Sequence, residues 1–248
     1  MLSKLIHNVR VLGLAAGAVL LAACSSDSAA PVPQAPPAPP PPPSATFELS
    51  VSNLTNAQPL SPIAAISHDS SYRVFRLGEA ASPGLEELAE GGSNAALLVE
   101  AAGDNGVFAT VASADPVPPG ASTTLRFTIL LAELPSAELS VSSMLVNTND
   151  AFSGINGLAI GDIAIGESLR VTGIAYDSGT EANTEQAIHI PGPVAGGEGF
   201  NAARDDRFDR VTMHSGIVGR DDGLADSDLD NQHRFDNPVL AATVTRID

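Results

Sequence analysis

The stretch Thr46-Phe47-Glu48-Leu49-Ser50-Val51-Ser52 decides the fold class of this chain. Its apolar residues alternate strictly with polar ones, which is the period of a β-strand with one face on a core and the other in water. Asn53-Leu54-Thr55-Asn56 follows directly and has the composition of a turn. The segment therefore predicts the first strand of a sheet that is covered on one side.

The rest of the folded region repeats this pattern. Short apolar or alternating runs are separated by Gly, Pro, Asn and Asp, a spacing that is typical of a β-sandwich and differs from alternating β and α units. The further strand candidates are residues 72–77, 107–111, 123–131, 139–146, 169–175, 209–214 and 239–247. We therefore expect an all-β protein with an antiparallel β-sandwich.

One or two short helices interrupt the strands. Ser82-Pro83-Gly84-Leu85 is the start of a helix, with Ser82 as the N-cap and Pro83 at the first helical position. The pair Gly91-Gly92 predicts its end. Residues 95–102 fit either a second helical turn or a strand.

The chain begins with an export signal. Residues 1–23 contain Lys4 and Arg10, then a short apolar run, then Leu21-Ala22-Ala23 before Cys24. This end resembles the lipobox of bacterial lipoproteins, in which the cysteine is lipidated and becomes the mature N-terminus. The resemblance implies lipidation of Cys24 and attachment to a membrane, whereas the alternative is an ordinary signal peptide with a chance cysteine. No Asp follows Cys24 directly, which favours the outer membrane, on its periplasmic or its cell-surface side.

Residues 24–45 are interpreted as a linker. Nine of the eighteen residues 28–45 are proline, which favours an extended polyproline II stalk with a reach of roughly 55 Å. Residues 46–248 then form the folded domain, which is within the size of a single β-sandwich.

Charge and cysteine content exclude several classes of function. The chain has 29 acidic and 12 basic residues, a net charge of −17. Because Lys4 and Arg10 lie in the predicted signal, the mature chain is near −19, which excludes a general nucleic-acid binder and allows divalent cations. Cys24 is the only cysteine, so internal disulfides, zinc fingers and cysteine nucleophiles are excluded.

Carboxylate clusters are the main chemical feature, because no nucleophile, phosphate-loop or His-ligand motif is present. Clusters at residues 147–154 and 176–183 follow candidate strands, so each is expected in an inter-strand loop. Such loops either bind Ca²⁺ through oxygen ligands or simply form turns. A third cluster, at residues 220–231, copies only part of an EF-hand loop, and a solvated acidic hairpin is the alternative. Whether the acidic segment Asp221–Asp236 binds a second metal stays open.

An ordered set of motifs resembles the spondin N-terminal domain family. The set runs through Asn53-Leu54-Thr55, Gln58-Pro59-Leu60-Ser61-Pro62, His68, Phe75, Gly78, Ala81-Ser82-Pro83-Gly84-Leu85, Leu88-Ala89-Glu90-Gly91, Pro119-Gly120, Ser143-Met144-Leu145-Val146, Asn149-Asp150-Ala151-Phe152-Ser153-Gly154-Ile155 and Tyr176-Asp177-Ser178-Gly179-Thr180-Glu181. The resemblance spans most of residues 46–248, although no single motif in it is specific.

The resemblance implies a sandwich similar to calcium-binding C-two domains, with a metal held by loops at one end. Asp150, Asp177 and Glu181 occupy the matching acidic positions and are the expected metal ligands, with Ca²⁺ as the expected cofactor. Ala151 replaces an aromatic residue and Glu181 replaces an Asp of the family pattern. Extracellular members of the family act in matrix adhesion. These departures, together with the missing disulfides and basic patches, count against that role for this chain more than against the fold.

Three functions follow from these observations. The leading hypothesis is a lipid-anchored, calcium-binding and non-catalytic envelope module for adhesion or for capture of a matrix, glycan or protein ligand. The second is a structural envelope lipoprotein without a metal, and the third is an envelope hydrolase with an acidic pair.

Overall fold

A computed structural model describes residues 40–202 and 208–248 of the chain, and Pro41–Asp248 form one folded unit. The predicted signal at 1–23, Cys24 and most of the predicted linker lie outside the described residues. Among the residues described, no helix has the length and apolarity needed to cross a membrane.

Within these residues most of the regular secondary structure is strand. The strands are β1 (Ser44–Asn53), β2 (Ala64–His68), β3 (Val107–Ala112), β4 (Ser122–Leu130), β5 (Glu138–Met144), β6 (Ala151–Ala159), β7 (Ser168–Asp177), β8 (Thr212–Met213) and β9 (Leu240–Arg246). The helices are α1 (Pro83–Gly91) and α2 (Ala95–Ala102), and four single 3₁₀ turns lie at η1 (Leu134–Ser136), η2 (Ala187–His189), η3 (Arg220–Asp222) and η4 (Asn231–His233).

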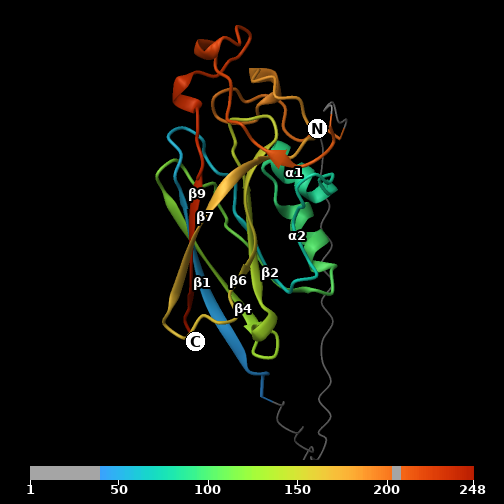
Figure 1. The fold of residues 1–248 in the computed structure, drawn as a ribbon, viewed down its shortest axis with the longest axis vertical. Coiled ribbons are helices and arrows are strands. Elements are labelled where there is room, and N and C mark those ends of the chain that lie inside the picture. Colours follow the sequence, from blue (N-terminus) through green and yellow to red (C-terminus); the bar gives the residue numbers. More distant parts are fainter. Residues whose placement is uncertain (1–39, 203–207) are drawn as a thin grey trace, which may run out of the picture. The chain divides into compact units, whose positions relative to one another are not determined.

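The strands form one antiparallel sheet in the order β3-β2-β5-β6-β7-β9-β1-β4, with β8 paired to β7. The edge strands β3 and β4 contact each other, so the sheet curls into a nearly closed, barrel-like sandwich, and Figure 1 shows the fold as a whole. The predicted all-β sandwich with two short helices is therefore confirmed.

The opening stretch behaves as its alternation predicts. Phe47, Leu49 and Val51 are fully buried in the main core, whereas the residues between them point outward. Phe47 stacks on Phe127 of β4, with ring centroids 5.3 Å apart. The strand begins at Ser44, two residues before the predicted domain boundary, because backbone pairing becomes available as soon as the proline run ends at Pro43.

The two helices cover the outer face of β2 and β6 and make a second core. Leu85, Leu88 and Leu97 pack there with Ile66 and Phe152. Ser82 caps α1 as predicted, since its hydroxyl accepts a hydrogen bond from the backbone N–H of Leu85 over 3.2 Å.

Some predicted boundaries are wrong. Residues 72–77 form a loop rather than a strand, because Val74 and Phe75 are apolar for packing against the second core. Strand β2 was not predicted, because every residue in it is buried and no alternation shows. Only Thr212–Met213 of the segment 209–214 is strand.

The cluster at 147–154 was predicted as a loop, but β6 begins inside it, at Ala151. Strands β6 and β7 pair only from Ala151↔Asp177 to Gly154↔Ile174. Beyond this ladder β6 stays with β5 and β7 stays with β9, so the two strands diverge (Figure 1).

Candidate metal-binding loops

The first two acidic clusters meet at one end of the sandwich. Ala151 and Asp177 are opposite each other in the ladder, so the loop before β6 lies beside the loop after β7. The backbone N–H of Ser178 donates to the carbonyl of Asp150 over 3.3 Å. The strand register places the start of β1 at the opposite end, because Phe47 pairs with Arg246 and Ser168 pairs with Thr245.

Asp150 is the buried centre of this region. Its Oδ2 accepts hydrogen bonds from the backbone N–H groups of Thr180 (2.9 Å) and Glu181 (3.1 Å) and from the Ser178 hydroxyl (2.8 Å). Its Oδ1 is buried and has no hydrogen-bond partner among the described residues. Burial, followed by the negative charge of Asp177, raises the pKa of Asp150 to about 7. One oxygen of this carboxylate is therefore committed to the loop, while the other lacks a compensating partner.

Asp177 and Glu181 line an open pocket at the acidic loops. The pocket has a volume of about 380 Å³, and Asn183, Arg210 and Met213 also line it. Asp177 accepts hydrogen bonds from the backbone N–H of Gly179 (2.8 Å) and from the side-chain amide of Asn183 (2.6 Å). The structure thus brings all three predicted ligands to one loop pair, in which Asp177 and Glu181 line the pocket and Asp150 is buried outside its lining.

Gly179 explains part of the local sequence. Its φ is +71°, and a Cβ added at this position would collide with the backbone of Arg210. Any side chain here would meet that backbone, so the turn that presents Thr180 and Glu181 to Asp150 requires glycine.

Two further ionisable residues belong to the region and were not predicted. Glu185 is buried, and its Oε1 accepts from the backbone N–H of Val218 over 3.2 Å. Burial, with a smaller effect of the Asp150 charge, raises the pKa of Glu185 to about 7. No motif marked Glu185, because it lies in an irregular segment that only the tertiary fold covers.

His214 is the second. Its Nδ1 accepts from the backbone N–H of Gly216 over 3.0 Å, so the neutral ring carries its proton on Nε2. This nitrogen is buried and has no hydrogen-bond partner in the part of the chain that the structure describes. Burial lowers the pKa of His214, and the charge of Asp177 opposes this shift. The sequence shows His214 only as a lone histidine near a candidate strand.

The side chains of the acidic loops are of the type that binds a hard cation, but the structure does not arrange them around one point. Within residues 40–202 and 208–248, no three His, Cys, Asp or Glu side chains converge on one point as a ready-made metal site. Carboxylates from adjacent loops, one with an orphaned buried oxygen, are nevertheless the ligands that Ca²⁺ takes together with carbonyls and water.

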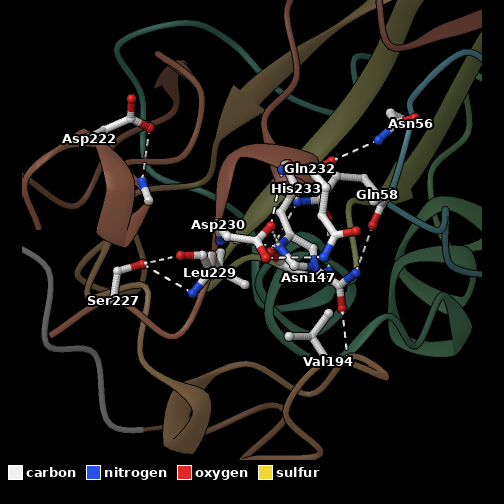
Figure 2. Close-up of polar contacts among 12 residues, drawn as sticks. Asn56, Gln58, Asn147, Val194, Asp222, Ser227, Leu229, Asp230, Gln232 and His233 are labelled. Carbon is white, nitrogen blue, oxygen red and sulfur yellow. Dashed lines mark hydrogen bonds and ion pairs between the residues drawn. The ribbon is translucent and has the colours of Figure 1, made fainter. Parts of the chain in front are cut away.

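The acidic C-terminal segment is engaged differently. Asp222 forms an ion pair with Arg234 at 2.8 Å, and Asp228 Oδ2 accepts from the backbone N–H of Ala187 over 2.7 Å. Asp230 Oδ1 accepts from the backbone N–H of Gln232 over 3.0 Å. The segment contains the 3₁₀ turns η3 and η4 rather than a hairpin; Asp222 and Asp230 also accept from backbone N–H groups at these turns (Figure 2), whereas Asp228 contacts a distant loop.

Gln58 fixes the loops behind this segment. Its buried Nε2 donates to the carbonyls of Asn147 (3.2 Å) and His233 (3.0 Å), and its Oε1 accepts from the backbone N–H of Asn147 (3.0 Å). Asn147 lies three residues before Asp150, so one amide ties three separate loops together beside the acidic region (Figure 2).

Together, fold and loops define a β-sandwich module with acidic loops gathered at the end remote from the start of β1. The family model described as Spondin_N matches residues 52–189, more than half of the chain. The chain therefore belongs to the spondin N-terminal domain family, as the ordered motifs indicated. A comparison with curated protein sequences finds no match.

Proposed function

We propose that this protein is a non-catalytic, calcium-binding module of the cell envelope that captures a matrix, glycan or protein ligand. The chain belongs to a family that is generally non-catalytic, which supports the non-catalytic role in this proposal. The observation that carries the calcium proposal is Oδ1 of Asp150, which is buried without a hydrogen-bond partner within the described parts of the chain and belongs to the loop pair whose Asp177 and Glu181 line a pocket. When bound, Ca²⁺ supplies positive charge that neutralises these carboxylates.

The residues of this chain have separate parts in the proposal. Asp150 holds the two loops together through Oδ2 and directs Oδ1 toward the cation. Asp177 and Glu181 supply carboxylates from the adjacent loop, and backbone carbonyls and water complete the shell of six to eight oxygens that calcium prefers. Because folded loops bind the cation and the unfolded chain does not, binding raises the stability of the domain.

We place the protein on the outer membrane, held through lipid on Cys24, with the proline-rich segment as a spacer. The position of the loops supports this arrangement, because β1 enters the fold at the end remote from Asp177. A tether that precedes β1 therefore leaves the acidic loops accessible to a ligand on the periplasmic or cell-surface side.

The test is a matched pair of variants of residues 41–248, freed of metal by chelation. We expect Asp177→Ala to have a lower melting temperature than the parent in saturating calcium and a much smaller deficit without calcium, where only its hydrogen bonds to Gly179 and Asn183 are lost. Asp162→Ala removes an exposed carboxylate outside the acidic loops and should behave as the parent in both conditions. Equal melting temperatures of Asp177→Ala and parent in saturating calcium would overturn the metal site and favour a structural envelope protein.

A further inference from the structure

A second pocket lies on the outer face of the sheet, where β6 and β7 diverge. It has a volume of about 520 Å³, within the range of small-molecule sites. It begins where the β6–β7 ladder ends at Gly154↔Ile174, and the loop at 72–77 forms one wall. It shares only Tyr176 with the strand end that carries Asp177 and is independent of the proposed calcium site.

The floor of the pocket is apolar and held rigidly. Phe75 packs against Tyr176 with ring centroids 4.6 Å apart and against Phe152 at 5.1 Å. Gly154 leaves the room for Phe75, because a Cβ there would lie 2.8 Å from the ring. Ile155 and Ile174 complete the floor.

Asn156 holds in place the loop at 72–77, which forms one wall of the pocket. Its Nδ2 donates to the carbonyl of Phe75 over 2.7 Å, and its Oδ1 accepts from the backbone N–H of Val74 over 3.1 Å. The loop at 72–77 is thus attached to β6, and the pocket is formed before any ligand arrives.

The rim is basic in a strongly acidic protein. Arg73 and Arg76 line the pocket, and no Asp or Glu is among its lining residues. Arg73 is committed to Glu138 at 2.7 Å, whereas the ion pair of Arg76 with Glu79 is 4.0 Å long and both side chains are more than half exposed. Arg76 is therefore the guanidinium able to turn toward an anion in the pocket at little energetic cost.

A third arginine has the same outward orientation. Arg170 precedes the lining residue Thr172 by two positions on β7, so both point to the same face of the sheet. Its positive charge adds to that of Arg76 on this face of the sheet, although Arg170 is not among the lining residues of the pocket.

From this geometry we infer that the pocket between β6 and β7 binds a small carboxylate with an apolar body, held by Arg76 over the floor of Phe75, Ile174 and Tyr176. The apolar body fills the floor and excludes water. The carboxylate stays at the rim, where Arg76 donates charge-assisted hydrogen bonds to it.

The experiment titrates residues 41–248 with phenylacetate and with octanoate, and follows binding by amide chemical-shift changes. We expect saturable binding, with shifts confined to 72–77, 154–156 and 172–176. The neutral amides of both probes should bind at least about tenfold more weakly, since they lack the charged acceptor. Inorganic phosphate, which has no apolar body, should also bind more weakly.

Variants make the assignment specific. Arg76→Gln should weaken binding of both carboxylates about tenfold, and Leu77→Glu, at an exposed rim position, should weaken it further by repulsion. Arg126→Gln removes an arginine of β4 paired to Glu48 and should leave binding unchanged. Equal binding of acids and amides, undiminished binding by Arg76→Gln, or no shifts at these residues would each overturn the assignment.

Discussion

The backbone N–H of Thr180 donates a hydrogen bond to Oδ2 of Asp150 over 2.9 Å, across thirty positions of sequence. This contact joins the loop before β6 to the loop after β7, and both loops carry the proposed calcium ligands. It is possible because the ladder from Ala151↔Asp177 brings these loops to the same end of the sheet.

Asp150 and Glu185 should make the metal-free domain lose stability as the pH rises from about 4 to about 7, while the buried His214, whose pKa is lowered, acts in the opposite direction. The pKa values of Asp150 and Glu185 are raised to about 7 in the folded state, so the folded protein binds these protons more tightly than the unfolded chain. The contribution of these two carboxyl groups to stability is therefore greatest below their unfolded pKa values and falls as the pH rises through their folded ones.

Asp150→Asn should remove part of this dependence, on the order of 3 kcal/mol between pH 4 and pH 7. The amide oxygen still accepts from Thr180 but carries no charge. Urea unfolding at several pH values measures the effect, with Asp162→Asn as control. The same pH slope for Asp150→Asn and the parent would contradict the assigned burial of this carboxyl group.

Gln58→Ala should destabilise the domain strongly. It leaves the carbonyls of Asn147 and His233 and the N–H of Asn147 without their buried partner, at a total cost of about 3 kcal/mol. For a domain of this size the melting temperature should fall by roughly 6–12 °C.

Asn56→Ala is the matched control for Gln58, since its amide makes an exposed hydrogen bond to the Gln232 carbonyl over 3.1 Å. Its loss should cost less than about 1 kcal/mol. Similar losses from the two variants in calorimetry would show that the Gln58 network does not hold the loops.

Gly154→Ala should lower stability by about 1–3 kcal/mol through overpacking against Phe75. The added Cβ would lie 2.8 Å from the ring, so the ring or the strand has to shift. Phe75→Leu should recover part of the loss in the double variant, which a double-mutant cycle of unfolding free energies detects.

Gly199→Ala serves as the control for Gly154, because its nearest neighbouring atoms lie 3.7 Å or more from the added carbon. It should change stability by less than about 0.5 kcal/mol. A strictly additive Gly154–Phe75 cycle would place the strain elsewhere.

The sequence predicts the structure best where a residue's environment is set by its neighbours in the sequence. The alternation of Phe47, Leu49 and Val51 and the cap at Ser82 depend on neighbours in sequence, and both predictions are confirmed. Strand β2 escapes prediction because α1 and α2 bury its outer face, which removes the alternation that marks a half-exposed strand.

Among the residues of the acidic loops, some were located from the sequence and others were not. Asp150, Asp177 and Glu181 were located by resemblance of motifs, and the structure brings them to one loop pair. Glu185 and His214 escaped prediction, because only long-range packing makes them buried and brings them into the field of Asp150 and Asp177. The pocket at Arg76 was also not predicted, because it arises where β6 and β7 cease to pair.

The most direct measurement is a calorimetric titration of the chelator-treated domain, residues 41–248, with Ca²⁺, together with melting curves at each calcium level. We predict a stoichiometric site and a melting temperature that rises with calcium. The absence of binding heat, with melting temperatures independent of calcium, would show that Asp150, Asp177 and Glu181 only shape turns and surface.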